Sequence, residues 1–346
     1  MKRVGIMTWY FGANYGAIAQ SIALYRAVEA LGYKCDMVNY KPRNYLKTII
    51  VTNIPKKGHR IKEFGKTVHG LKKCYRLTRY KYITETRSVN TPEEIDQLGL
   101  DWIVFGSDAI FNIRHLLFMP VYYGVGIKTN KVTYSPSCEF ASEGSILPQD
   151  YIDSLKEMRA LSVRDTNTYT LVKNNTGIDP VITLDPTFLE NFEDINCPIS
   201  ENEYLLIYSF SDWEIYKESI LKFAREKRLK VISIGKQLDW ADKSYPDASF
   251  EQWISAFRDA SLVITDSFHG TVFSLKNKKQ IVLCGREDKK AKINSLLKQF
   301  SADLAIFKGE ALEQYLATNV IDYSITQPLI EKEIQKSREY LMAALS

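Results

Sequence analysis

Short apolar runs alternate with amphipathic helical patterns along almost the whole chain. Near the N-terminus, "RVGIMTW" predicts a buried strand, "AIAQSIALYRAVEALG" has apolar residues at helical spacing, and "KCDMVNY" predicts a second strand. The same alternation returns from "YLLIYSF" to "QIVLC". Strands that alternate with helices in this way pair in parallel and are covered by helices. We therefore predict an α/β fold.

Two domains are expected, because 346 residues exceed what one hydrophobic core normally organises. The alternation is interrupted by a proline-containing, acidic stretch at residues 181–203, which predicts a linker. We expect a Rossmann-like domain over residues 1–188, a second over residues 200–325, and a C-terminal helix over residues 327–346 that packs back on the first domain. Two Rossmann-like domains facing a ligand cleft are the predicted architecture.

The charge is unevenly distributed, although the net charge is only +5. A basic insert at residues 41–90 interrupts the first domain, and its part from Lys41 to Lys81 holds thirteen Lys or Arg against one acidic residue, Glu63. Aromatic and aliphatic side chains are interleaved with these cations. The pattern predicts an anionic partner, such as a membrane surface, a phosphorylated ligand or nucleic acid. The alternative is a solvated pair of basic helices.

Several function classes are excluded by what the chain lacks. Its five cysteines are scattered and never spaced as CxxC, which argues against a disulfide framework or a zinc site and for a reducing compartment. No GxxxxGK[ST] loop, complete GxGxxG fingerprint or GxSxG elbow occurs. No apolar window is long enough to span a membrane. We predict a cytoplasmic protein without a catalytic metal.

A histidine follows one predicted strand of the second half, in "VITDSFHGTVF". His269 is one of only four histidines, and it lies where a strand ends and a helix begins. Helix N-termini there favour a carboxylate or phosphate group. The imidazole of His269 is therefore the best-placed group for proton transfer. The alternative is that Ser267 merely caps the helix and His269 packs in its first turn.

Strand ends of the first half carry further candidates. Arg164 in "LSVRD" offers a planar fork of donors that fits a carboxylate or phosphate, or else it pairs with Asp165. Ser107 and Asp108 end the strand in "FGSDAIFN", and Asn14 follows the first strand in "WYFGANYGA". Such side chains can contact sugar hydroxyls. Asp108 can also act as a base or as a helix N-cap.

Five stretches in order resemble the polysaccharide pyruvyl transferase family: "GIMTWYFGANYGAIAQSIALYRAVEALGY", "DWIVFGSDAIFN", "LSVRD", "LDPTFL" and "TDSFHGTVFSLKNKKQIV". The resemblance runs from about Val4 to Leu297. It implies a glycosyltransferase-B-like fold, with the acceptor bound on the first domain and the donor on the second. It also implies transfer of the pyruvyl group of phosphoenolpyruvate to a sugar of a surface polysaccharide or its lipid-linked precursor, with a pyruvate ketal formed and phosphate released.

The resemblance also assigns roles to residues. It places Arg164 and His269 at the donor, and the chemistry then requires His269 as the general acid and suggests Asp108 as the base for the attacking hydroxyl. The family motif Arg-x-His has Ser267 in place of its arginine, so Arg286, Lys236 or Lys292 is expected to compensate. The predicted substrate-binding residues are Arg164, Ser267, Arg286, Asn14, Ser107 and Lys236. Phosphoenolpyruvate serves as the donor substrate, and no cofactor is implied.

The implied partners are a saccharide acceptor, linked to a lipid diphosphate or free, and an anionic membrane surface contacted through residues 41–81. No nucleic acid is expected. The protein is then cytoplasmic and peripheral on the inner face of the membrane. Two alternatives stay open, because a fold does not determine a function. They are a nucleotide-sugar transferase on the same fold and a non-catalytic relative that binds sugar or phosphate.

Overall fold

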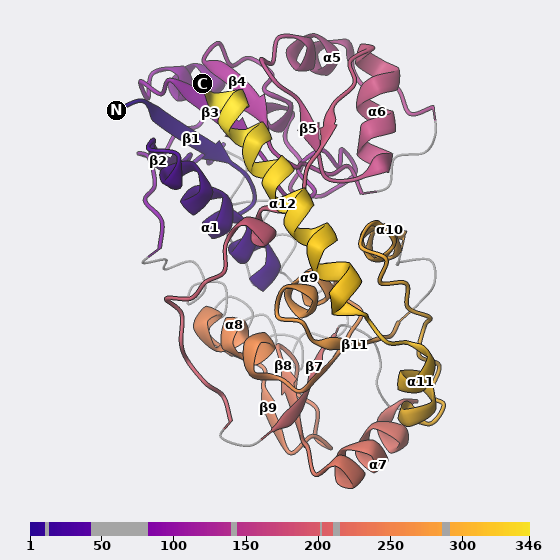
Figure 1. The fold of residues 1–346 in the computed structure, drawn as a ribbon. Coiled ribbons are helices and arrows are strands. Elements are labelled where there is room, and N and C mark those ends of the chain that lie inside the picture. Colours follow the sequence, from indigo (N-terminus) through magenta and orange to yellow (C-terminus); the bar gives the residue numbers. More distant parts are fainter. Residues whose placement is uncertain (11–13, 43–81, 140–143, 201–202, 210–214, 286–290) are drawn as a thin grey trace, which may run out of the picture. The chain divides into compact units, whose positions relative to one another are not determined.

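The computed structural model describes residues 1–10, 14–42, 82–139, 144–200, 203–209, 215–285 and 291–346 (Figure 1). Two compact units form, one from Met1–Glu190 with Glu333–Ser346 and the other from Asn191–Lys332. Residues 43–81, the main part of the basic insert, lie outside the described residues, so their predicted membrane contact stays a prediction. Among the described helices, none is both long and apolar enough to cross a bilayer.

The first unit contains a parallel sheet. Its strand order is β2 (Lys34–Met37), β1 (Arg3–Met7), β3 (Trp102–Phe105), β4 (Asn130–Thr133). A second parallel pair, β5 (Ser162–Val163) and β6 (Val181–Ile182), continues beyond β4 through a bridge between Val132 and Ala160. The predicted strand in "ALSVRD" is therefore present, but only two residues of it pair regularly.

Helices cover both faces of this sheet, because alternate residues of each strand point to opposite sides. Val104 packs in one apolar cluster with α1 (Tyr15–Ala30) and the end of α12 (Tyr323–Leu345), whereas Ile103 and Phe105 pack in another with α5 (Gln149–Lys156). Thr91 caps α4 (Pro92–Asp96), since its side chain accepts a hydrogen bond from Glu94 N at 3.3 Å. The helical elements are α1 (Tyr15–Ala30), α4 (Pro92–Asp96), η1 (Pro120–Tyr123), α5 (Gln149–Lys156), α6 (Thr166–Thr176) and η2 (Pro186–Leu189).

The C-terminal helix α12 (Tyr323–Leu345) begins earlier than the predicted start at Gln327. Its residues from Glu333 onward belong to the first unit. Ser337 Oγ accepts a hydrogen bond from Leu184 N at 3.0 Å, and the Tyr340 hydroxyl donates to Thr133 O at 2.9 Å. Leu341, Ala344 and Leu345 are buried in the same apolar cluster as β1 and α1.

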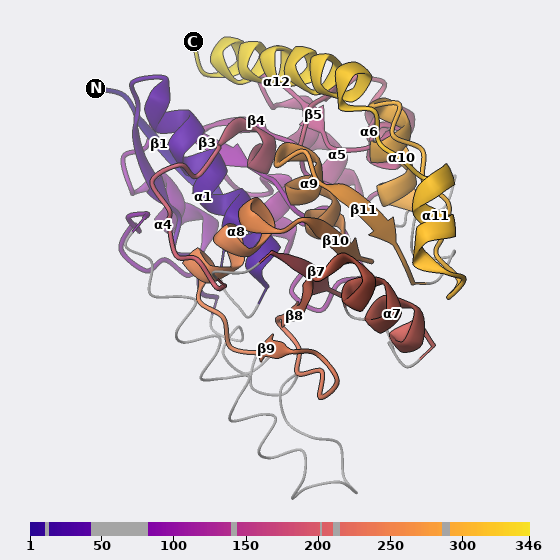
Figure 2. The same cartoon turned by 60° about the horizontal axis from the view of Figure 1, so that its bottom comes forward.

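The second unit contains a five-stranded parallel sheet with helices on both faces (Figure 2). Leu205 and Ile207 pack with α7 (Lys217–Lys227) and α11 (Leu312–Thr318), whereas the neighbouring Tyr208 contacts Trp253 and Phe257 of α8 (Phe250–Asp259). The strand order is β11 (Gln280–Leu283), β10 (Leu262–Thr265), β7 (Tyr204–Tyr208), β8 (Lys230–Ile234), β9 (Lys243–Tyr245). The helices are α7 (Lys217–Lys227), α8 (Phe250–Asp259), α9 (Phe268–Lys276), α10 (Ala291–Gln299) and α11 (Leu312–Thr318).

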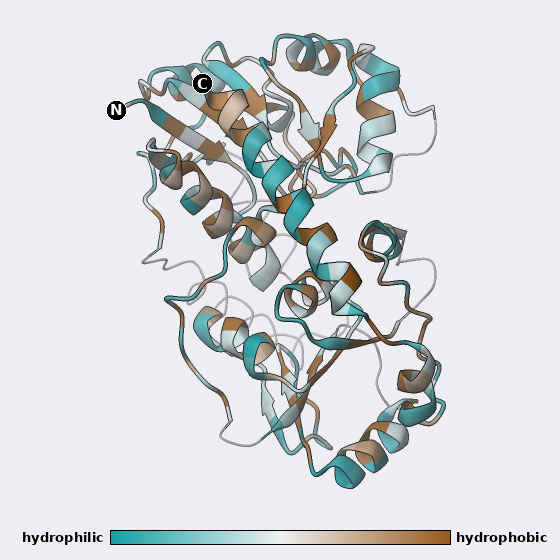
Figure 3. Ribbon diagram, viewed as in Figure 1, coloured by the Kyte–Doolittle hydropathy of each residue, from teal (hydrophilic) through white to brown (hydrophobic). Residues whose placement is uncertain are grey.

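The packing follows the hydropathy of the elements. Figure 3 shows polar and apolar residues together on α7 and α12, as expected of helices that press one side on a sheet. Apart from Lys230 at its edge, β8 is buried, and β10 is buried along its whole length. Such continuous burial is typical of strands in a parallel sheet covered on both faces. The predicted α/β class is confirmed in both units.

Each sheet has a point where the strand order reverses direction. In the first unit this point lies between β1 and β3, and in the second it lies between β7 and β10. Parallel sheets of this kind bind ligands outside the carboxyl ends of the strands at the reversal, because the loops there diverge to opposite faces. The two reversal points therefore locate the candidate site within each unit.

Candidate functional site

The turn after β10 brings Ser267 and His269 to the reversal point of the second sheet. Ser267 is the N-cap of α9, and its hydroxyl accepts a hydrogen bond from Gly270 N at 3.3 Å. Ser267 N in turn donates to Thr265 Oγ1 at 3.1 Å. Ser267 therefore caps α9, which is one of the two roles that the sequence left open. The cap also orients the first turn of α9, in which His269 lies.

Gly270 is required by the close approach of α9 to the sheet. A Cβ atom at this position would lie 2.2 Å from Thr265 Oγ1 and 3.1 Å from Tyr208 Cδ1. Thr265 itself is fully buried, and its hydroxyl donates to Tyr208 O at 2.7 Å. Contacts this short are not tolerated by a side-chain atom, so only glycine lets the helix start here. The histidine before it is thereby held at the strand end.

His269 is 8% exposed, and its ring contacts Phe268 edge-on with the centroids 5.4 Å apart. The ammonium group of Lys292 on α10 lies over the same Phe268 ring, 6.0 Å from its centroid. A cation is therefore present beside the first turn of α9. Lys236 follows β8 at the same edge of the sheet, and its carbonyl accepts a hydrogen bond from Ser233 Oγ. Arg286 lies outside the described residues.

Tyr208 is a residue of this edge that sequence reasoning missed. It ends β7 directly beside Thr265 of β10 and is 3% exposed. Burial raises the pKa of its hydroxyl far above the ordinary value, and a hydrogen bond with Ser267 partly offsets that effect. Its hydroxyl contacts Ser267 and so supports the turn after β10. No local pattern in "YLLIYSF" could have revealed this contact.

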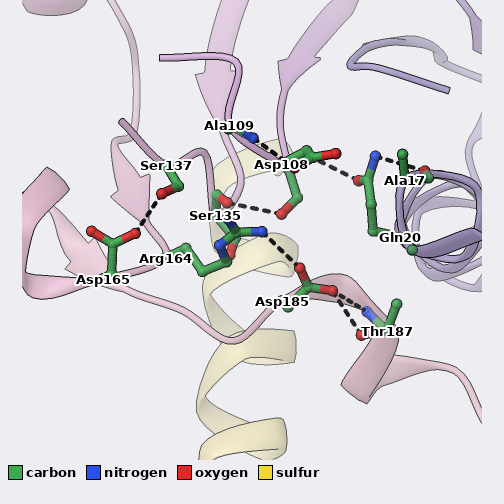
Figure 4. Close-up of polar contacts among 12 residues, drawn as sticks. Ala17, Gln20, Asp108, Ala109, Ser135, Ser137, Arg164, Asp165, Asp185 and Thr187 are labelled. Atoms are coloured by element: carbon green, nitrogen blue, oxygen red, sulfur yellow. Dashed lines mark hydrogen bonds and ion pairs between the residues drawn. The ribbon is translucent and has the colours of Figure 1, made fainter. Parts of the chain in front are cut away.

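The first unit places Arg164 after β5, where it forms a buried ion pair with Asp185 (Figure 4). Arg164 Nη1 lies 3.1 Å from Asp185 Oδ2, and the two side chains are 6% and 0% exposed. The other oxygen of Asp185 accepts hydrogen bonds from Thr187 N and Thr187 Oγ1. Asp185 comes from the "LDPTFL" stretch, to which the sequence had assigned no role.

Three carboxylates act on the Arg164 guanidinium. Burial alone would lower its pKa, but the charges of Asp185, Asp108 and Asp165 raise it above the ordinary value. Asp165 uses its carboxylate to cap α6, accepting from Thr168 N at 2.8 Å, and to accept from Ser137 Oγ at 2.6 Å. The ion pair with Asp185 holds the Arg164 side chain in place.

Asp108 lies near the start of the loop that follows β3. Its φ of 68° is in the left-handed region, and Ser135 (φ 55°) and Glu139 (φ 57°) after β4 share that conformation. Left-handed backbone at non-glycine residues costs free energy and concentrates at functional sites. One carboxylate oxygen of Asp108 accepts from Ala109 N at 2.8 Å. Asp108 is half-buried at the reversal point.

Ser107 is fully buried and supports this loop. Its hydroxyl donates to Ser135 O at 2.9 Å, and its backbone N–H donates to Gln20 Oε1 at 3.3 Å. Gln20, which sequence reasoning missed, also donates to Thr8 Oγ1 at 3.0 Å. Because its donors are used inside the unit, Ser107 is placed to orient Asp108. The prediction that it contacts substrate remains untested.

Asn14 caps α1 at the same reversal point. Its side-chain oxygen accepts from Gly16 N at 3.0 Å and from Ala17 N at 3.4 Å. Four predicted residues, Asn14, Ser107, Asp108 and Arg164, thus lie at the carboxyl edge of the first sheet. Ser267, His269 and Lys236 lie at the carboxyl edge of the second.

A sequence model of polysaccharide pyruvyl transferases matches residues 14–288. The chain belongs to this family. The matched stretch contains every predicted site residue of both sheet edges, whereas Lys292 lies just beyond it. No curated protein matches the chain in sequence.

Solved structures share the fold of this chain at low sequence identity. UDP-GlcNAc 2-epimerase from Neisseria meningitidis, bound to UDP-GlcNAc, is similar with a TM-score of 0.56 and 9% identity over 100% of this chain and 99% of that one. Arabidopsis thaliana UGT89C1 complexed with UDP-L-rhamnose is similar with a TM-score of 0.54 and 9% identity over 99% and 98%. At such identities the likeness concerns the fold alone, and it confirms the predicted glycosyltransferase-B-like architecture.

Proposed function

We propose that the protein transfers the pyruvyl group of phosphoenolpyruvate to a sugar of a surface polysaccharide or its lipid-linked precursor and releases phosphate. The observation that carries this proposal is the family match over residues 14–288, which includes a histidine fixed at the reversal point of a parallel sheet. The reaction needs a general acid, because the methylene carbon of the donor must gain a proton before its neighbouring carbon is attacked. Imidazole titrates close to neutral pH and suits that task.

The proposed sequence of steps assigns roles to both sheet edges. His269 protonates the methylene carbon, and positive charge develops on the adjacent carbon, C2. A sugar hydroxyl attacks C2 and passes its proton to Asp108. A second hydroxyl of the same sugar then replaces phosphate at C2 and passes its proton to His269, which closes the cyclic ketal and restores the acid. The bond between C2 and the phosphate oxygen breaks in that last step.

The cations at the two sheet edges have different roles in the proposed reaction. Arg164 is balanced by Asp185 and by two further carboxylates, so it adds little net positive charge. We assign it hydrogen bonds to the donor carboxylate, for which its rigid fork is suited. Lys292 and Lys236 supply charge to the phosphate, and Lys292 compensates for the missing arginine at position 267. A cationic site also stabilises the leaving phosphate.

Ligand-dependent thermal stability tests the donor assignment. At 100 times its dissociation constant, phosphoenolpyruvate should stabilise the protein by about 2.7 kcal/mol. Lys292→Ala should weaken that effect, whereas Lys298→Ala, an exposed lysine of the same helix, should leave it unchanged. Stabilisation by uridine or guanosine nucleotides alone would contradict the proposal and favour a nucleotide-sugar transferase.

Phosphate release from phosphoenolpyruvate, measured with and without a sugar acceptor, tests catalysis. His269→Ala should lower turnover by about 10² to 10⁴-fold, because it removes the general acid. Unchanged turnover in this variant would refute its role. Intact donor binding without any turnover of the wild type would indicate a non-catalytic binding protein.

A further inference from the structure

A pair of aromatic rings lies at the reversal point of the first sheet, apart from the residues used so far. Trp9 follows β1, and His115 lies in the loop after β3, with ring centroids 4.2 Å apart and ring planes at 36°. Tyr122 of η1 meets Trp9 edge-on, with the centroids 6.3 Å apart. This cluster shares the edge of the sheet with Asn14 and Asp108, where ligands of parallel sheets bind.

The hydrogen bonding of His115 fixes its chemical character. Leu117 N donates to His115 Nδ1 at 3.1 Å. In a neutral imidazole one ring nitrogen accepts and the other carries the proton, so Nε2 is a donor here. A half-buried ring with a fixed N–H group suits recognition of a hydroxyl oxygen. It does not suit proton abstraction, because the accepting nitrogen is already occupied by the backbone.

Trp9 supports the His115 ring. Its side chain is 7% exposed, and the Tyr122 hydroxyl lies beside its indole N–H group. Tyr122 also meets the indole edge-on, so Trp9 presents a fixed ring for the imidazole to stack on. The loop that contains His115 also exposes Ile113 and Leu116, which are 44% and 73% accessible.

We propose that His115, stacked on Trp9, recognises a pyranose ring of the saccharide acceptor. This inference rests on the proposed function and extends it to a residue that recognises the acceptor. The ring face contacts the apolar C–H face of the sugar, and Nε2–H donates to one of its hydroxyls. Because Nδ1 already accepts from Leu117 N, the ring offers one N–H donor and an aromatic face, and this combination fits an uncharged sugar ring and not a phosphate group.

Binding of a panel of methyl glycosides of glucose, galactose, mannose and N-acetylglucosamine to the full chain tests the proposal by saturation-transfer NMR. At least one should bind the wild type, and His115→Ala should weaken it about tenfold, equivalent to about 1.4 kcal/mol. His115→Phe keeps a ring without the N–H group and should weaken binding by roughly threefold, as expected for one lost hydrogen bond. Ile146→Ala, an exposed loop residue of the same unit, should change nothing.

The outcomes separate this inference from the proposed function. Glycoside binding that depends on His115, without phosphate release from phosphoenolpyruvate, supports the inference while the proposed function fails. Phosphate release with an acceptor KM that is the same in His115→Ala and wild type overturns the inference alone. The inference is also overturned when no glycoside of the panel binds the wild type.

Discussion

The buried ion pair of Arg164 and Asp185 gives the sharpest test of how the first unit holds its site. Asp185→Asn removes the charge but keeps an oxygen for Thr187. With both side chains almost inaccessible and 3.1 Å apart, loss of one partner leaves a buried charge poorly compensated. Removing one member of such a pair costs about 3 to 5 kcal/mol. Asp108 and Asp165 also act on Arg164, so we expect about 3 kcal/mol.

Urea unfolding followed by circular dichroism measures this loss. With a slope of about 2 to 3 kcal/mol per M, a loss of about 3 kcal/mol lowers the midpoint by about 1 to 1.5 M urea. Asp179→Asn is the matched control, because Asp179 also pairs with a cation, Lys173, but is 62% exposed. The control should leave the midpoint almost unchanged, since solvent screens an exposed pair.

A double variant decides whether the cost arises from the unpaired charge. Arg164→Met combined with Asp185→Asn leaves no isolated cation, so it should be more stable than the sum of the two single changes predicts. If the losses of unfolding free energy in the two single variants add strictly, the unpaired charge is not the cause of the cost. A urea midpoint for Asp185→Asn equal to that of Asp179→Asn would likewise contradict a stabilising role of the buried pair.

Two further predictions concern the second unit. Gly270→Ala should destabilise the protein by about 1 to 3 kcal/mol through overpacking against Thr265 Oγ1, and Thr265→Ala should restore part of that loss in urea unfolding. Burial raises the pKa of Tyr315 from 10.0 to about 12, so the folded state keeps this proton where the unfolded state loses it. The contribution of Tyr315 to the free energy of unfolding should therefore be constant below about pH 10 and fall as the pH rises towards 12. Phenolate absorbance that develops near pH 10, before unfolding begins, would count against a buried Tyr315. The variant Tyr315→Phe must then remove that early part of the absorbance signal.

The periodic patterns were sufficient to predict the fold class and most strands, because burial in a parallel sheet leaves a continuous apolar run such as "SLVITD". They also identified the polar positions at the strand ends, among them Asp108 and His269. The family resemblance, confirmed by the match over residues 14–288, added the fold type that periodicity alone does not provide. Short strands such as β9 carry too few residues for a pattern to appear.

The partners of the site residues could not be predicted. Asp185 is remote from Arg164 in the sequence. Arg164 follows β5 and Asp185 follows β6, so the two side chains meet only because these strands pair. Tyr208 ends β7 and Ser267 follows β10, and these two strands become neighbours only after folding. Sequence patterns describe what each segment does locally, whereas these contacts depend on the order of strands in the sheet.

The hydrogen bonds of α12 have a consequence for the biosynthesis of the protein. Leu184 N and Thr133 O of the first unit find their partners in Ser337 and Tyr340, which the ribosome adds long after residue 190. At typical rates of translation the delay is roughly 10 to 30 s. During that time the nascent first unit carries an uncovered apolar surface where Leu341 and Leu345 will later pack. Although synthesis of the first unit begins first, the second unit, which ends at Lys332, has all its residues before the first unit does.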